Sequence, residues 1–308
     1  MRRNDLRTLL ACLLAVALTP SLSSGQEDAV DAPLDAPVLE KGVFPAGWAD
    51  LAADCGHARP WRIHEYNPTF FIIRQSGCTH FEKPFLYLII GSNEAMLVDT
   101  GAGNADVRDP VNAVMRGRTE PGPDRSLPLL VIHTHGHGDH TAGDGALQGR
   151  RNTRVVAATV SAVSQFFGIQ NWPLGTATYD LGNSVLDIVP IPGHETAHIA
   201  IYDRRTGILL TGDTLYPGRL YVSNHQAYRD SVDRLVAFTQ TRPIAHALGA
   251  HIEQTRHPFL DYVVGTQFQP EEHVLELGRS HLVELQSALQ GMPTLTRTWL
   301  RDFTIWPF

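Results

Sequence analysis

The chain has 308 residues, of which 43% are hydrophobic and 19% are charged, and its formal net charge is −7 at pH 7. This composition is typical of a folded protein with enough apolar residues to form a large core. The acidic balance, without a run of Lys or Arg, argues against nucleic acid or an anionic membrane surface as a partner.

Residues 1–25 have the pattern of a secretory signal peptide. Arg2, Arg3 and Arg7 precede the apolar run at residues 9–18, which is followed by small residues. The apolar run is too short for a membrane anchor, which needs about 20 residues. We therefore expect a periplasmic or secreted protein with no membrane attachment after signal cleavage. Cleavage removes three Arg and one Asp, so the formal charge changes from −7 to −9.

The mature chain is expected to hold a flexible leader and one domain. Residues 26–42 are rich in Ala, Pro and Asp and predict the leader, so the domain is expected at residues 43–308. Cys55 and Cys78 remain after signal cleavage, and an even cysteine count in an oxidising compartment predicts a disulfide between them. The alternative is a pair of buried free thiols.

Apolar runs and turn residues predict strands alternating with helices. Strands are expected at residues 69–74, 84–90, 95–98, 127–132, 155–158, 178–191 (a hairpin turning at Gly182-Asn183), 199–203, 207–210 and 244–248. Helices are expected from Asp109, as the cap before Pro110, and at residues 159–167, 226–241 and 271–289. This order predicts an α+β domain with sheets covered by helices.

A cluster of potential metal ligands follows the strand expected at residues 127–132. It reads His135-x-His137-x-Asp139-His140, with glycine at both spacer positions. Residues two apart in an extended segment point the same way, so His135 and His137 are expected to bind one ion. Asp139 and His140 are adjacent and are better placed to bind a second ion nearby.

Three further candidate ligands each follow an expected strand, and strand ends carry functional loops to a common rim. These ligands are His194, Asp213 and His251. The seven residues exceed the four ligands of one zinc ion. The sequence therefore predicts two sites joined by a bridging carboxylate: His135, His137 and His194 for the first, Asp139, His140 and His251 for the second, and Asp213 as the bridge.

This series of motifs resembles the metallo-β-lactamase superfamily from Asp99 to His251. Asp99-Thr100-Gly101 resembles its first, structural motif, residues 135–140 its second, and His194, Asp213 and His251 the later ones. The resemblance implies a four-layer αβ/βα sandwich. A bridging aspartate is similar to the glyoxalase II-like and lactonase-like branches, whereas class B1 β-lactamases have a cysteine there.

The resemblance also implies an activity and two catalytic residues. The expected function is an exported dinuclear-metal hydrolase that uses a metal-bridging hydroxide to cleave an ester, thioester, lactone or lactam of a small-molecule substrate. The expected cofactors are two Zn²⁺ ions, with Fe or Mn as alternatives. Asp139 is expected to orient the hydroxide and relay a proton. Tyr216 resembles a substrate-contacting tyrosine of quorum-lactone hydrolases; its alternative is a packed aromatic.

Other functions remain open on the sequence alone. They are a true β-lactamase, a mononuclear iron persulfide dioxygenase-type enzyme, which would use two His and one Asp, and a non-catalytic metal-binding module. Glyoxalase II itself is disfavoured because only 57 residues follow His251, too few for its helical C-terminal domain. His133 is expected to be buried or to support a ligand, and His198 either supports His194 or packs in the core.

Overall fold

The computed structural model describes residues 38–49, 55–116, 118 and 127–308. The expected signal peptide and residues 26–37 of the expected leader lie outside the described residues. At the start of the described part, the Glu40 N–H donates to the carbonyl of Arg205 at 2.9 Å, so contacts with the domain begin before residue 43.

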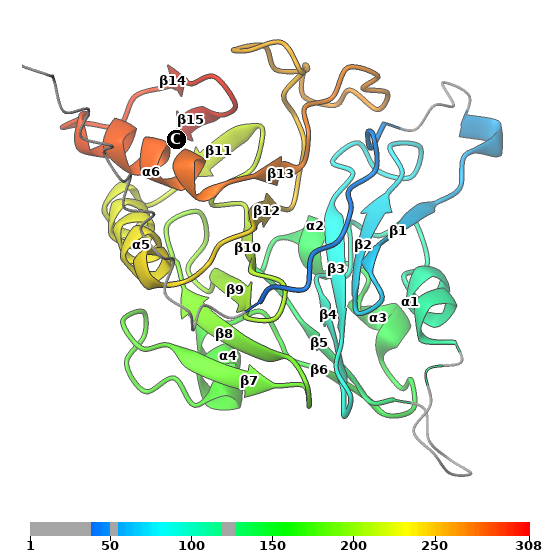
Figure 1. Cartoon of the computed structure of the whole chain (residues 1–308). Helices are drawn as coiled ribbons and strands as arrows, with labels where there is room; N and C mark the ends of the chain where they lie inside the picture. The colour runs from blue at the N-terminus through cyan, green and yellow to red at the C-terminus, as the bar shows by residue number, and fades with distance from the viewer. Residues whose placement is uncertain (1–37, 50–54, 117, 119–126) are drawn as a thin grey trace, which may run out of the picture. The chain divides into compact units, whose positions relative to one another are not determined.

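Two six-stranded mixed sheets form the centre of the domain (Figure 1). The first has the order β1-β2-β3-β4-β5-β6, with strands Trp61–Asn67, Phe70–Gln75, Phe85–Ile90, Ala95–Val98, Leu129–Ile132 and Thr153–Val155. Its β1 to β4 are antiparallel neighbours, while β4, β5 and β6 are parallel. The hydrophobic runs of β2 to β5 are buried on both faces of this sheet.

The second sheet has the order β13-β12-β10-β9-β8-β7. Its strands are Glu276–Leu277, His246–Gly249, Ile208–Gly212, Ile199–Asp203, Val185–Pro190 and Ala177–Asp180. Strands β10 and β12 are parallel, and the other neighbours are antiparallel. A smaller sheet has the order β11-β15-β14, with strands Arg219–Val222, Thr304–Pro307 and Thr298–Trp299.

Six α-helices and two short 3₁₀ turns complete the described residues. The helices are α1 Arg108–Met115, α2 Gly138–Thr141, α3 Asp144–Leu147, α4 Val160–Phe167, α5 His225–Phe238 and α6 Arg279–Gln290; the 3₁₀ turns are η1 Cys55–His57 and η2 Thr239–Thr241. None of the described helices combines the length and the apolar character that crossing a membrane requires.

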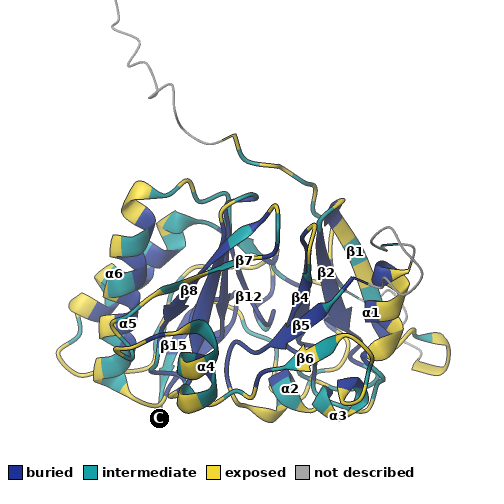
Figure 2. Ribbon diagram, turned by 90° about the horizontal axis from the view of Figure 1, so that it is seen from below, coloured by how far each residue is buried: buried dark blue, intermediate teal, exposed yellow. Residues whose placement is uncertain are grey.

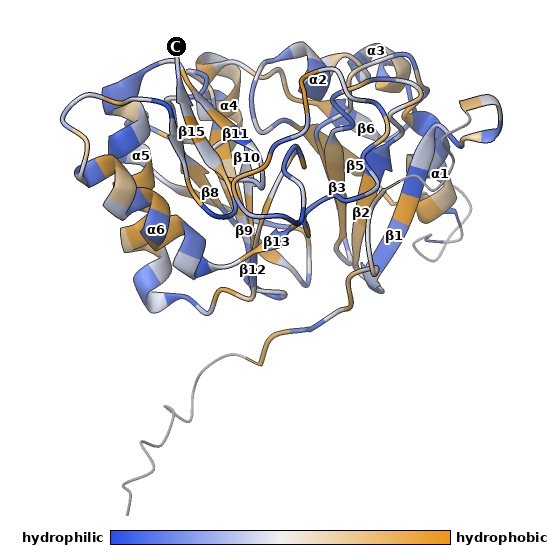
Figure 3. Ribbon diagram, turned by 90° about the horizontal axis from the view of Figure 1, so that it is seen from above, coloured by the Kyte–Doolittle hydropathy of each residue, from blue (hydrophilic) through white to orange (hydrophobic). Residues whose placement is uncertain are grey.

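Alternating side chains of the strands build three apolar layers. In β3, Phe85, Tyr87 and Ile89 enter the core between the two sheets, whereas Leu86 and Leu88 face the layer that contains α1. A third cluster joins the second sheet to α5 and α6. Figures 2 and 3 show buried, hydrophobic strands between these outer helices. This helix–sheet–sheet–helix arrangement confirms the expected four-layer sandwich.

Two helix starts differ from the sequence-based expectation. Helix α1 begins at Arg108, and the Asp106 carboxylate accepts the Arg108 N–H at 2.9 Å, so Asp109 lies in the first turn and is not the cap. The last long helix begins at residue 279 because residues 276–277 pair with β12 as the edge strand β13 and Gly278 follows them. The expected strand at residues 155–158 pairs two residues earlier, as β6.

The predicted disulfide is present. Cys55 and Cys78 are bonded, with their Cα atoms 5.3 Å apart. The bond joins η1 to the loop between β2 and β3. This loop continues through residues 81–83 into a wall of the candidate active site, described below.

Candidate metal centre

The predicted ligands all follow the carboxyl ends of strands. His135 and His137 follow β5, and Asp139 and His140 lie on the one-turn helix α2. The other three candidates follow β8, β10 and β12 of the second sheet. These three strands run in the same direction, because β9 is antiparallel to both β8 and β10 while β12 is parallel to β10. Their carboxyl ends therefore present the ligands at one edge of the sheet, beside the end of β5.

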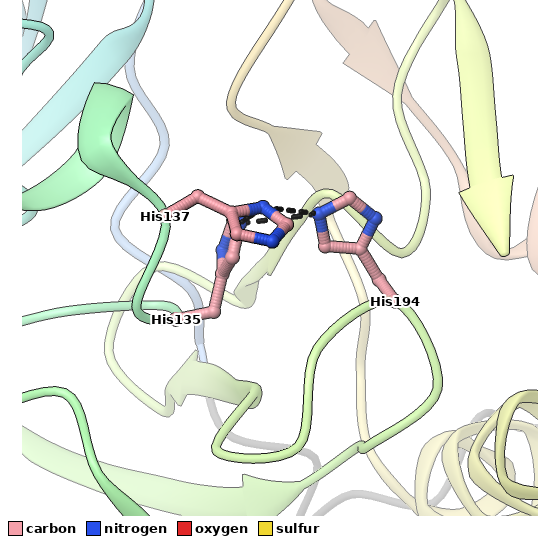
Figure 4. Close-up of side chains that lie close together, drawn as sticks. All are labelled: His135, His137 and His194. Atoms are coloured by element: carbon pink, nitrogen blue, oxygen red, sulfur yellow. Dashed lines mark hydrogen bonds between the residues drawn. The ribbon is translucent and has the colours of Figure 1, made fainter. Parts of the chain in front are cut away.

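The first group contains three imidazoles that point toward one another (Figure 4). His137 Nδ1 lies 2.9 Å from His135 Nε2 and 3.0 Å from His194 Nε2, and the latter two nitrogens are 3.2 Å apart. Tetrahedral zinc, with Zn–N bonds of about 2.0–2.1 Å, separates its ligand nitrogens by about 3.3 Å. The triangle of nitrogens therefore has the size required to bind one small cation.

The second group contains Asp139, His140, His251 and Asp213. Asp139 Oδ2 lies 3.1 Å from Nε2 of both His140 and His251. Asp213 Oδ1 lies 3.6 Å from His140 Nε2 and 3.5 Å from His251 Nε2. The structure thus brings together the four side chains expected at the second site.

Asp213 lies between the two groups. While its Oδ1 faces the second group, its Oδ2 lies 3.5 Å from His194 Nε2 and 4.0 Å from His135 Nε2. One carboxylate therefore presents one oxygen to each group. This is the arrangement that the sequence predicts for a bridging ligand.

Hydrogen bonds at the second ring nitrogen orient three of the histidines. His194 Nδ1 donates to the carbonyl of Tyr221 at 2.8 Å, and His251 Nδ1 donates to the carbonyl of Glu82 at 3.0 Å. These backbone acceptors were not identified from the sequence, because any residue can supply a carbonyl. In each ring Nε2 is left facing the site, as metal ligation requires.

Asp99 orients the third ring and the loop that carries the first ligands. Its Oδ2 accepts from His140 Nδ1 at 2.9 Å, and its Oδ1 accepts the Thr134 N–H at 2.7 Å. The Thr134 hydroxyl also donates to Asp99 Oδ2 at 2.9 Å. The carboxylate is fully buried, so it holds both His140 and the start of the His135 loop in place.

His198 contacts the expected ligand His194, with ring centroids 5.8 Å apart, and also two other candidate ligands. Its Nε2 accepts the Asp213 N–H at 3.1 Å, and its ring stacks on His135 with centroids 4.7 Å apart. Close packing here requires Gly212, because a Cβ at this position, where φ is +49°, would lie 2.7 Å from the His198 ring. His133 is buried, as expected, and its Nε2 donates to Asp144.

The two groups differ in electrostatics. Burial and the neighbouring imidazoles hold the pKa of His135 well below its usual value, and burial lowers the pKa of His194. Burial also disfavours protonation of His251, but the carboxylates of Asp213 and Asp139 outweigh it and raise the pKa to about 9. His135 and His194 are therefore neutral near pH 7, whereas the second group is an ion-paired cluster.

Unpartnered polar atoms indicate that the second group is suited to a cation. His140 Nε2 and Asp213 Oδ1 are buried without a hydrogen-bond partner. Such atoms are costly unless something binds them. Together with the imidazole triangle and the histidine–carboxylate donor set, they fit a pair of divalent metal ions.

A pocket with a volume of about 220 Å³ opens onto this centre, and His137, Asp139 and His251 line its base. Tyr216 lines it too, with its ring centroid 5.6 Å from that of His251. The Tyr216 hydroxyl donates to the carbonyl of Arg219, so its proton is already bonded within the protein.

Comparison with known proteins identifies the family. The family model described as the metallo-beta-lactamase superfamily matches residues 83–242, more than half of the chain. The chain belongs to the metallo-β-lactamase superfamily. The match includes six of the seven predicted ligands, and His251 lies beyond its end.

The relatives of this superfamily member include several named hydroxyacylglutathione hydrolase. The chain is 32% identical to one from Cereibacter sphaeroides over 157 residues, covering 48% of this chain and 59% of the relative. A relative from Erythrobacter litoralis is 28% identical, and the match covers 54% of this chain and 62% of the relative. One from Chelativorans sp. is 30% identical, with 35% and 44% covered. The chain thus spans about half the length of the curated relatives it matches.

Solved structures of the superfamily share the fold. A metallo-beta-lactamase from Pontibacter korlensis aligns with a TM-score of 0.53 at 17% identity, covering 75% of this chain and all of that one. A second, from Hirschia baltica, has the same TM-score at 16% identity, with 77% and 100% covered. At these identities the likeness supports the metallo-β-lactamase fold, as predicted, and nothing about substrate.

Proposed function

We propose that this superfamily member is a metal-dependent hydrolase with two divalent cations, zinc by preference, in the centre formed by the seven predicted ligands. The observation that carries the proposal is the position of Asp213, which directs one oxygen toward each ligand group. Relatives named for hydrolysis of hydroxyacylglutathione support the same reaction class.

The bound cations would lower the pKa of a water molecule and polarise the substrate carbonyl. Asp139 supplies the carboxylate that orients this water and accepts its proton. Burial opposes ionisation of Asp139, but the His140 and His251 rings outweigh it and hold its pKa below the usual range, so the carboxylate is ionised. The Tyr216 ring is 1% exposed and its hydroxyl proton is already bonded, so the alternative of a packed aromatic accounts for its place in the pocket wall.

The substrate is a small molecule with an ester, thioester, lactone or lactam bond. A pocket of about 220 Å³ above the ligand groups is large enough for the reacting part of such a molecule. Hydrolysis adds water across the carbonyl–heteroatom bond and yields an acid and an alcohol, thiol or amine. The acidic net charge of the chain disfavours nucleic acid as a partner.

We further propose that the protein is exported and acts in the periplasm or outside the cell. A signal peptide at residues 1–25 is removed, and the mature protein consists of a leader at residues 26–42 and a domain at residues 43–308. The Cys55–Cys78 disulfide supports this location, because such bonds persist mainly in oxidising compartments.

The central test joins metal analysis to a substrate panel. The mature protein, loaded with zinc and dialysed, is expected to retain two zinc ions per chain and to hydrolyse at least one class among oxoesters, thioesters, lactones and β-lactams. Asp213→Ala should lower kcat/KM by at least roughly 100-fold and reduce the zinc content. Asp230→Ala, the same change on the exposed face of α5, is the matched control and should alter neither quantity.

Two results would contradict the proposal. A single iron per chain in protein purified without added metal, together with oxygen consumption in the presence of a persulfide, would instead identify an iron oxidoreductase. Two bound zinc ions with no turnover on any class of the panel would identify a metal-binding module without hydrolase activity.

A further inference from the structure

The pocket above the ligand groups has an apolar mouth. Val263 and Val264 line it with 79% and 62% of their surface exposed, and Phe81 and Phe308 line it with 37% and 73% exposed. Large apolar side chains grouped at the mouth of a pocket mark a binding surface, because water contact with them is unfavourable. These four residues are called the apolar mouth below.

The two valines are held in this exposed position by a tight turn. The Thr266 N–H donates to the Val263 carbonyl at 3.1 Å, and the Thr266 hydroxyl donates to the same oxygen at 2.7 Å. Gly265 has a φ of +89°, which a glycine adopts without strain at the third position of such a turn. The turn is therefore a defined structure and presents Val263 and Val264 beside the pocket.

Two buried cationic side chains, Arg219 and Lys83, bind the backbone on either side of the valines. Arg219 donates to the Tyr262 carbonyl, just before Val263, and pairs with Glu253 at 3.0 Å. Lys83 donates through Nζ to the Thr266 carbonyl at 2.8 Å, just after Val264 and Gly265. Both cationic side chains are buried, so the turn that they hold is a fixed part of the pocket wall.

The same bonds engage the cationic side chains that line the described pocket outside the ligand groups. Among the described lining residues outside the ligand groups, the cationic side chains are Lys83 and Arg219. Lys83 Nζ is bonded to the carbonyls of Phe81 and Thr266, and Arg219 is paired with Glu253 and, at 3.7 Å, with Asp261. The acidic residues Glu82 and Glu253 also line the pocket and add no positive charge to it.

We propose that the apolar mouth binds an alkyl or aryl group of an uncharged ester or lactone whose carbonyl lies over the ligand groups. This inference rests on the proposed hydrolase function and narrows its substrate class. Water adds to the carbonyl carbon, the carbon–oxygen single bond breaks, and the products are a carboxylic acid and an alcohol. The alkyl or aryl group contacts the two valines and two phenylalanines of the apolar mouth and is thereby removed from water.

The test compares substrates that differ in chain length and in one charge. Across phenyl esters from acetate to hexanoate, kcat/KM is expected to rise by up to about fourfold per added methylene. Phenyl hydrogen adipate, which carries a carboxylate at the end of the hexanoate chain, should be hydrolysed at least about tenfold less efficiently than phenyl hexanoate. S-lactoylglutathione, an anionic thioester, should also be a poor substrate.

Variants of the turn separate binding from chemistry. The double substitution Val263→Ser/Val264→Ser keeps Gly265 and the backbone bonds, so the protein should fold with an unchanged melting temperature. It should raise KM for phenyl hexanoate by at least about tenfold with kcat nearly unchanged, and it should flatten the dependence on chain length. Leu174→Ser is the matched control, because Leu174 is 66% exposed and does not line the pocket.

A binding measurement keeps this inference separate from the hydrolase proposal. The ketone 1-phenylheptan-2-one has a methylene in place of the ester oxygen of phenyl hexanoate and cannot be hydrolysed. Calorimetry should show saturable binding of this ketone to the zinc-loaded protein and weaker binding to the double serine variant. Ketone binding without turnover of any substrate would support the apolar mouth while contradicting the hydrolase proposal.

Two outcomes would overturn the inference. One is hydrolysis in which adipate or glutathione substrates equal or exceed phenyl hexanoate. The other is ketone binding that is absent, or that is the same in the wild type and in the double serine variant.

Discussion

At the scale of single residues, a hydrogen bond from Nδ1 sets the direction in which Nε2 points in three of the candidate histidine ligands. His194 and His251 donate to backbone carbonyls, and His140 donates to the buried carboxylate of Asp99. Asp99 has the greatest influence of these acceptors, because it also holds the backbone and hydroxyl of Thr134 next to His135. Its charge further stabilises the His140 ring when that ring binds a cation.

We expect Asp99→Asn to weaken the second metal site selectively. The amide can still accept the Thr134 N–H through one oxygen, but its NH₂ group would face the His140 Nδ1–H, and two donors cannot bond to each other. The affinity for the second zinc should fall by roughly 10- to 100-fold, with a smaller effect on the first. Zinc titration by calorimetry measures both constants.

Asp144→Asn is the control for this substitution. Asp144 accepts from His133, a histidine that belongs to neither ligand group, at 2.8 Å. The control tests the loss of a His–Asp pair on a neighbouring element and should leave both zinc constants within about threefold of wild type. Equal losses in the two variants would show that Asp99 stabilises the fold generally and does not orient His140.

At the scale of elements, the loop between β2 and β3 connects the disulfide bond to the candidate site. It contains Cys78, bonded to Cys55, and continues to Glu82, whose carbonyl accepts from His251. It also carries Phe81, which is part of the apolar mouth, and Lys83, which donates to the turn that presents Val263 and Val264. One loop therefore supports a candidate metal ligand and a pocket wall.

Reduction of the disulfide is expected to lower the stability of the domain. Cys55 and Cys78 are separated by 23 residues, and closing a loop of this length in the unfolded chain stabilises the folded state by about 3 kcal/mol. Urea unfolding with and without reductant measures the difference. The variant Cys55→Ala/Cys78→Ala should unfold at the lower urea concentration and be insensitive to reductant; sensitivity equal to that of wild type would contradict the prediction.

At the scale of the whole domain, the candidate centre joins the two sheets. Four of its residues follow β5 of the first sheet, and three follow β8, β10 and β12 of the second. Bound cations would therefore link two halves that also pack together through the apolar core between the sheets. Because unfolded chain cannot assemble seven ligands, metal binding is expected to stabilise the folded protein by mass action.

Zinc at 1,000 times its dissociation constant should add about 4 kcal/mol to the free energy of unfolding. For a domain of this size, the corresponding rise in melting temperature is roughly 7 °C. Differential scanning calorimetry with zinc and with a chelator measures the shift. Asp213→Ala should lose most of it, whereas Asp230→Ala should retain it; an equal shift in all three proteins would place the stabilising ion elsewhere.

The sequence by itself determined the family, the layered fold, the disulfide and the set of residues that converge on the centre. The strands and the ligand set depend on local information: alternating apolar residues predict buried strands, and ligands placed directly after strands meet where the strands end. The disulfide was predicted from an even cysteine count in an oxidising compartment, and the family from the order of its motifs. The supporting role of Asp99, which directly follows β4, was implied by the resemblance of Asp99-Thr100-Gly101 to the first motif of the superfamily.

Only the tertiary structure decided which partners complete these features. Strands β11 and β15 and the start of α6 depend on pairing between segments that are distant in sequence, which leaves no clear local pattern. Strands β1 and β14 were also not predicted, although each pairs with the strand that follows it in the chain. The carbonyls of Glu82 and Tyr221 and the turn at residues 263–266 belong to the site because the chain returns to it. Which groups meet across the fold is set by packing, and a linear pattern records packing only where the neighbours are close in sequence.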